Sequence, residues 1–172
     1  MANKIIDQLV LAVFAVMICL ILLTFADYGV SWDEPIQAQY GNLVLSFFAT
    51  GFDDRAVLTF QNLQSYGGLF DALVELVAKA SPWAPHETRH LVTALTGLLG
   101  IAGAWRFARY SAGPVAGLVT TLFLISVPSY YGHLYINPKD IPFAAGYIWT
   151  LYFIVKAFEE FPKIATRDSL IL

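Results

Sequence analysis

The feature that most constrains this chain is a run of 19 residues without a charged side chain, between Asp7 and Asp27. A helix needs about 17–25 apolar residues to cross the hydrocarbon core of a bilayer, so this run is long enough. It is too long for the core of a signal peptide, and no small-x-small cleavage site with a soluble domain follows it. We therefore expect a retained membrane anchor at the start of the chain.

Three further stretches are apolar enough to cross a membrane. One lies between Arg89 and Arg106 and requires both arginines to reach toward the headgroups. Another falls within the uncharged run that ends at Pro138, and the last follows Asp140. The sequence thus predicts an all-α integral membrane domain over residues 1–172, with about four transmembrane helices at 8–26, 90–107, 114–132 and 141–158.

Composition supports a membrane protein and excludes several other classes. The chain is 58% hydrophobic and 13% charged, against roughly 45–50% and 25% in soluble domains. Its net charge of −3 argues against a nucleic-acid partner. The single cysteine, Cys19, provides neither an internal disulfide nor a multi-thiolate metal site. The partner predicted by composition is the lipid bilayer.

The distribution of charge predicts the orientation. With both chain ends and the 106–113 loop in the cytoplasm, six basic residues lie inside and four outside, as the positive-inside rule favours. Nine of the 13 carboxylates then lie outside. We expect a multi-pass protein of the plasma (bacterial inner) membrane, with a cytoplasmic N-terminus and its active face outward.

The outer loop, residues 27–89, contains two patterns typical of interfacial helices, at about 35–49 and 69–80. In the second pattern Asp71, Glu75 and Lys79 recur every four residues and share one face, while apolar side chains cover the other. Such a helix is expected to lie on the membrane surface.

Two polar clusters stand at the outer ends of the predicted spans. The first is the adjacent pair Asp33 and Glu34, which either caps the following helix or supplies a general base to a membrane-bound substrate. The second is the segment YYGHLYINPKD, in which Asp140 again admits a capping role. Its polar groups suit a phosphate and sugar hydroxyls, and its candidate ligands are Tyr131, His133, Asn137, Lys139 and Asp140.

The order of these motifs resembles the GT-C glycosyltransferases, in particular the protein O-mannosyltransferase and aminoarabinose-transferase branch. The resemblance rests on Asp33-Glu34, on SYGGLFD before the second interfacial helix, on Arg89-His90 at the start of the second span, and on Asn137-Pro138-Lys139-Asp140. It implies transfer, with inversion, of a sugar from a polyprenyl-phosphate donor to a hydroxyl of a glycolipid, glycan or protein. It implies no metal or organic cofactor.

The resemblance also implies roles for particular residues. Asp33 matches the acidic residue that removes the acceptor proton, Glu34 orients it, and Asp140 matches a second acidic position. Lys139 becomes the counter-charge of the donor phosphate. The further candidate substrate-binding residues are Asn137, His133, Tyr131, Arg89 and Tyr66. Because GT-C modules have at least seven spans, we expect these 172 residues to be the N-terminal part of a longer module.

Two other classes of protein remain as alternatives. His86-Glu87-Thr88-Arg89-His90 matches the H-E-x-x-H pattern of zinc peptidases, with His133 as a third ligand. Pro85 directly before the motif and the positive charge of Arg89 weigh against that interpretation. The other alternative is a non-catalytic four-helix membrane subunit, in which Asp33 and Asp140 only cap helices.

Overall fold

The computed structural model describes residues 2–161, and within them every regular element is a helix. This confirms the expected all-α membrane fold. The elements are α1 (Ala2–Thr24), α2 (Glu34–Ala49), the short 3-10 helices η1 (Ala56–Thr59) and η2 (Leu63–Ser65), α3 (Leu69–Ala80), α4 (Pro85–Ala112), α5 (Pro114–Ser126), α6 (Pro128–Ile136) and α7 (Asp140–Glu160). Lys163 and Arg167, which the orientation prediction counts as cytoplasmic, lie outside the described residues.

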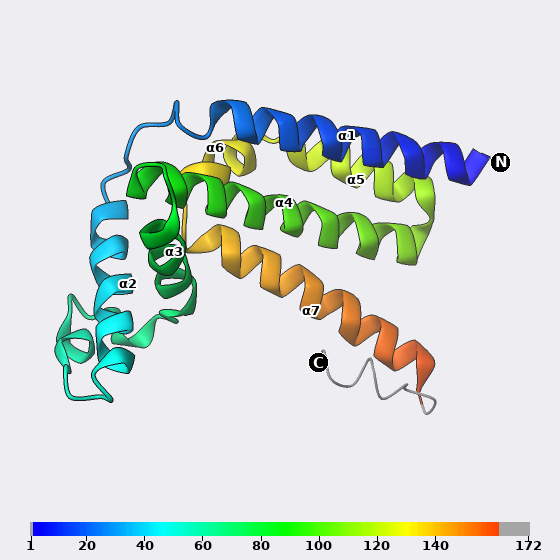
Figure 1. The fold of residues 1–172 in the computed structure, drawn as a ribbon. Helices are drawn as coiled ribbons and strands as arrows, with labels where there is room; N and C mark the ends of the chain where they lie inside the picture. The colour runs from blue at the N-terminus through cyan, green and yellow to red at the C-terminus, as the bar shows by residue number, and fades with distance from the viewer. Residues whose placement is uncertain (1, 162–172) are drawn as a thin grey trace.

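Figure 1 shows α1, α4, α5 and α7 running lengthwise through the molecule, with α2 and α3 across one end. Three helices are long and apolar enough to cross a membrane, at Asn3–Thr24, Pro85–Ala112 and Asp140–Glu159. Arg109, near the end of α4, forms a two-pronged ion pair with Asp7 of α1 at 2.7 and 2.8 Å. The start of α1 and the end of α4 therefore lie at the same end of the bundle, away from α2 and α3.

The third expected span, 114–132, is not one straight helix. The chain bends by 68° between α5 and α6. Proline has no N–H and disfavours helical geometry in the residue before it. Val127, which precedes Pro128, is accordingly extended (φ −76°, ψ 112°). Counted together, the two helices give a fourth candidate span.

α4 lies at the centre of the bundle and contacts α1, α3, α5, α6 and α7. The main hydrophobic core joins it to α1 and α6 through Met17, Ile21, Phe25, Leu91, Ala94, Leu98, Ile101, Leu134 and Tyr135. On the α7 side the packing depends on small residues. A Cβ at Gly100 would lie 3.3 Å from the Cα of Ala145, so the missing side chain allows the two backbones to approach closely.

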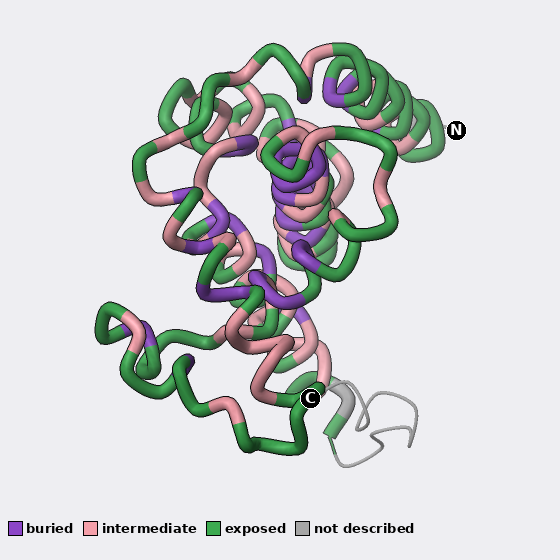
Figure 2. The backbone as a smooth tube through the Cα atoms, turned by 60° about the vertical axis from the view of Figure 1, so that its left-hand side comes forward, coloured by how far each residue is buried: buried purple, intermediate pink, exposed green. Residues whose placement is uncertain are grey.

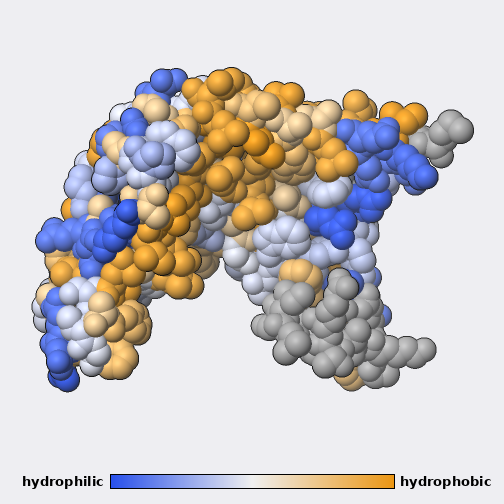
Figure 3. Space-filling view, in the orientation of Figure 1, coloured by the Kyte–Doolittle hydropathy of each residue, from blue (hydrophilic) through white to orange (hydrophobic). Residues whose placement is uncertain are grey.

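Helix α3 has its charged face turned into the protein. Asp71 and Glu75 are buried, whereas Leu69 and Leu76 are 73% and 56% exposed. Figure 3 shows hydrophobic surface continuing from the lengthwise helices onto the α2–α3 end of the molecule. An apolar face exposed at this level suits contact with lipid, as expected of an interfacial helix.

A glycine on α2 sets the distance between α2 and α3. A Cβ at Gly41 would lie 2.6 Å from the carbonyl oxygen of Asp71, closer than real Cβ atoms come. We expect Gly41→Ala to destabilise the fold by about 1–3 kcal/mol, the usual effect of overpacking. Gly146→Ala is the matched control, because it also lies in a helix and its Cβ would meet nothing within 4 Å. Thermal unfolding in detergent measures both, and equal melting temperatures would contradict the close packing.

Candidate functional site

The polar side chains of both sequence clusters lie at the end of the molecule where α2, α3, the start of α4 and the α6–α7 turn meet. Figure 2 shows buried residues concentrated in the middle of the molecule. Several of them are charged or polar, which is costly unless they are paired. The buried polar residues at this end are Glu34, Gln37, Asp71, Glu75, Thr88, Arg89 and His90.

Arg89 connects α4 to α3. Its Nη1 donates to Asp71 Oδ1 at 2.8 Å, and its Nη2 donates to Glu75 Oε1 at 2.6 Å. Asn42 of α2 donates to the other Glu75 oxygen at 2.9 Å. The Arg89 side chain is 2% exposed. The structure thus places this predicted substrate-binding residue inside the protein, with its guanidinium bound to two carboxylates.

Lys139 is linked to the same carboxylates through Gln37. The Gln37 amide, in the orientation that satisfies both neighbours, donates to Asp71 Oδ2 at 2.9 Å and accepts from Lys139 Nζ at 2.8 Å. The Lys139 ammonium also lies 4.8 Å from the ring centroid of Tyr66. The structure therefore brings together two predicted substrate-binding residues, Lys139 and Tyr66.

The pKa of Asp71 is raised above its ordinary value by burial, although hydrogen bonding and charge attraction from Arg89 oppose the shift.

Glu34 forms the second buried contact between titratable side chains. Its Oε1 lies 2.9 Å from His90 Nε2, and its Oε2 accepts the backbone N–H of Ser31 at 2.5 Å. Burial acts to raise the pKa of Glu34, but the hydrogen bonds from His90 and Ser31 outweigh it and leave this pKa below its usual value. The stabilisation that comes from ionised Glu34 is therefore present at neutral pH and is lost as the pH falls through the lowered pKa.

Asp33 is partly exposed and sits beside this pair. Its Oδ1 accepts a hydrogen bond from the Ser31 hydroxyl at 2.9 Å, and its side chain makes no capping bond to α2. The same hydroxyl lies 3.3 Å from the carbonyl oxygen of Ile136 at the end of α6. The backbone of Asp33 accepts from Gln37 N–H at 3.0 Å. Asp33 is therefore held one helical turn from Gln37, the residue that binds Lys139.

Three further candidates, His133, Asn137 and Asp140, line a neighbouring cavity. Asn137 Oδ1 accepts the backbone N–H groups of Lys139 and Asp140, and its Nδ2 donates to Asp140 Oδ2 at 2.9 Å. Asn137 thereby closes the turn that begins α7. With His133 and Asp140 it lines a cavity of about 230 Å³. Tyr131 instead packs edge-on against Tyr135, with ring centroids 6.2 Å apart.

A larger groove of about 570 Å³ has Lys139 and Asp140 at one side. Gln37, Tyr66 and Asp71 also line it. Its remaining wall is mostly apolar and comes from α3 and the start of α7, through Leu69, Phe70, Leu73, Pro142 and Phe143. The groove therefore combines one ammonium group and two carboxylates with a long hydrophobic wall.

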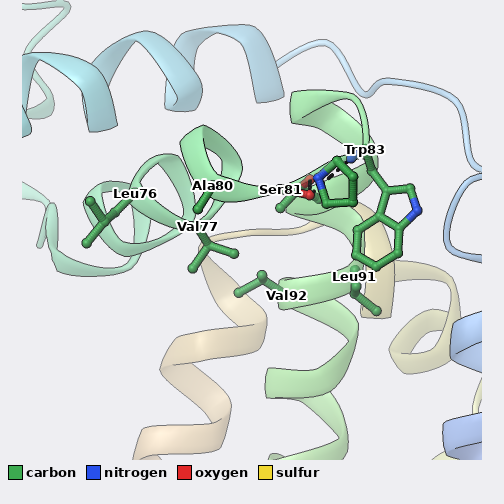
Figure 4. Close-up of a pocket in the computed structure, with 9 residues that line it drawn as sticks. Leu76, Val77, Ala80, Ser81, Trp83, Leu91 and Val92 are labelled. Carbon is green, nitrogen blue, oxygen red and sulfur yellow. Dashed lines mark hydrogen bonds between the residues drawn. The ribbon is translucent and has the colours of Figure 1, made fainter.

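Figure 4 shows a different cavity, of about 410 Å³, between the end of α3, the following turn and α4. Leu76, Val77, Trp83, Leu91 and Val92 surround it. Its polar Ser81 hydroxyl is engaged by Thr88 Oγ1 at 2.7 Å and by the backbone N–H of Trp83 at 3.2 Å. No charged side chain lines this cavity, so the polar chemistry of the site lies elsewhere.

The H-E-x-x-H segment has other functions in the fold. Glu87 Oε2 accepts the backbone N–H of Ala84 at 3.0 Å and so fixes the start of α4. His90 pairs with Glu34, and its ring centroid lies 5.9 Å from that of His86. Among residues 2–161, no three His, Cys, Asp or Glu side chains come together as a metal site. The zinc-peptidase alternative therefore has no supporting ligand set.

Sequence reasoning did not identify Gln37, Asp71, Glu75 or His90 as members of the site. The weak signal for His90 was its position beside Arg89, at the polar start of an apolar helix. For Asp71 and Glu75 the signal was their four-residue spacing, which also fits a solvated helix face. Nothing in the local sequence distinguishes Gln37.

Comparison with known proteins gives one match. Residues 85–166 match the model of the dolichyl-phosphate-mannose-protein mannosyltransferase family. The match begins at the first residue of α4, and it includes Arg89, His90 and the Asn137–Asp140 turn. No curated protein and no solved structure matches the chain. Residues 85–166 are therefore similar to dolichyl-phosphate-mannose-protein mannosyltransferases, which supports the resemblance of this membrane protein to glycosyltransferases of the GT-C type.

Proposed function

We propose that the protein transfers a sugar, with inversion, from a polyprenyl-phosphate donor to a hydroxyl group of a glycolipid, glycan or protein. The proposed location is the outer face of the plasma (bacterial inner) membrane. The observation that carries the proposal is the groove lined by Lys139 and by apolar side chains of α3 and α7. Asp33 lies one helical turn from Gln37, which binds Lys139.

The groove has the two properties that a lipid-phosphate donor requires. Its ammonium group offsets the negative charge of the phosphate, in the substrate and more strongly as the phosphate leaves. Its apolar wall, which includes Leu69, Leu73 and Phe143, suits an isoprenoid chain entering from the bilayer. Asp71, although it lines the same groove, is bound to Arg89 and Gln37.

In this proposal Asp33 acts as the general base. In the proposed step the acceptor oxygen attacks the anomeric carbon from the side opposite the phosphate. The new carbon–oxygen bond forms as the bond to the phosphate oxygen breaks, and the lipid phosphate leaves with that electron pair. The acceptor proton passes to the Asp33 carboxylate. The scheme uses no metal ion or organic cofactor.

The test of this proposal is the role of Lys139. Lys139→Ala is expected to raise the KM for the polyprenyl-phosphate sugar on the order of 10-fold or more, because a charge-assisted bond to phosphate contributes in the ground state as well as in the transition state. Lys139→Arg keeps the charge and is expected to retain most of the affinity. The assay is sugar transfer in membranes of a strain that lacks its own copy of the gene and expresses the complete reading frame.

The matched control is Lys79→Ala, because Lys79 is an exposed lysine on α3 that does not line the groove. It is expected to leave the KM unchanged. Size-exclusion chromatography in detergent checks that each variant is folded. An unchanged KM for folded Lys139→Ala would refute the groove as the donor site.

A further inference from the structure

His90 lies at the junction of three elements, with a polar atom close to each ring nitrogen. Nδ1 is 3.2 Å from the carbonyl oxygen of Phe25 at the end of α1, and Nε2 is 2.9 Å from Oε1 of Glu34 at the start of α2. Among the described residues, neither Nε2 nor Oε1 has a hydrogen bond to any other group, so this approach is the only polar contact of each atom. The His90 side chain is 0% exposed, so water does not replace either partner. The ring is therefore held between the end of α1 and Glu34.

This contact is connected to Asp33 through two further hydrogen bonds. Glu34 uses its second oxygen to accept the backbone N–H of Ser31. The Ser31 hydroxyl then donates to Oδ1 of Asp33. Among the described residues, no group donates to Oδ2 of Asp33. One oxygen of the proposed base is therefore fixed and the other is free to accept a proton from a substrate.

We infer that His90 is a positioning residue for the proposed transfer: it anchors Glu34, and through Glu34 and Ser31 it fixes the orientation of the Asp33 carboxylate. This inference rests on the proposed function, because it concerns the base of that reaction. It assigns Glu34 a role that acts through Ser31 and does not require contact with substrate.

The kinetic test is His90→Phe, which keeps a planar ring but removes both ring nitrogens. We expect kcat to fall about 10- to 100-fold, as misplacement of a reacting group does, with little change in the KM for the donor. His90→Gln, which keeps an N–H donor for Glu34, is expected to recover part of this loss. His86→Phe, one turn away on the same helix and exposed, is the matched control.

A purely structural role for His90 would lower the yield of folded protein without changing kcat per folded molecule. That outcome would overturn the inference. So would a His90→Gln variant that is no more active than His90→Phe.

The two proposals fail separately. Wild-type transfer by Asp33→Asn would overturn the proposed function. An unchanged kcat in folded His90→Phe, with kcat lost in Asp33→Asn, would overturn only the inference.

Discussion

Asp33→Asn is expected to lower the rate of sugar transfer by about 10²- to 10⁴-fold, the usual contribution of a general base, while the amount of folded protein stays unchanged. Asparagine has the size of aspartate, and its Oδ1 still accepts the hydrogen bond from the Ser31 hydroxyl. The Asp33 side chain makes no capping bond to α2, so no cap is lost. The substitution therefore removes proton acceptance and little else.

The measurement is initial-rate transfer from a polyprenyl-phosphate sugar in membranes, normalised to folded protein. Asp53→Asn is the matched control, because Asp53 is an exposed carboxylate of the same outer loop and takes no part in the site. Wild-type turnover by Asp33→Asn would show that this carboxylate does not remove the proton. Equal losses in both variants would point to the charge of the loop in general.

The largest expected effect on stability comes from Arg89. Arg89→Met leaves Asp71 and Glu75 buried without their cation, and their side chains are only 6% and 8% exposed. Removing one partner of a buried ion pair typically costs about 3–5 kcal/mol, because the remaining charge is uncompensated. We expect a loss of free energy of unfolding of this size, and little folded protein at growth temperature.

A triple variant separates this charge effect from lost packing. Arg89→Met combined with Asp71→Asn and Glu75→Gln removes both anions together with the cation, and is expected to recover most of the stability, because a fully neutral replacement of a buried pair is often tolerated. Denaturation by SDS in mixed micelles measures the stability of both variants. The control is Lys79→Gln, a substitution of an exposed residue. If the triple variant were as unstable as Arg89→Met, the uncompensated charge would not be the cause.

The positions of the long helices could be predicted because helix formation and membrane insertion depend on local sequence. The uncharged run before Asp27 is long enough to cross a bilayer in whatever fold follows it. The four-residue spacing of Asp71, Glu75 and Lys79 likewise indicated a helix, which the structure places at Leu69–Ala80. The bend at Pro128 was harder to predict, because the hydropathy of an uncharged run does not indicate the direction of its helix.

The arrangement of charges could not be read in the same way. The sequence placed Asp71 and Glu75 on one face of a helix, but it did not show whether water or Arg89 would neutralise that face. Arg89, by itself, was equally compatible with a phosphate ligand. Only the packing of α3 against α4 directs the guanidinium to the carboxylates, at 2.8 and 2.6 Å.

The sequence by itself determined that this chain is a helical membrane protein and that its motifs Asp33-Glu34 and Asn137–Asp140 resemble those of GT-C glycosyltransferases. The tertiary structure decided which polar groups meet: Lys139 with Gln37, and Glu34 with His90. The physical reason is that hydropathy and helix formation act between near neighbours in the chain. A buried charge, in contrast, must find its partner wherever the fold brings one.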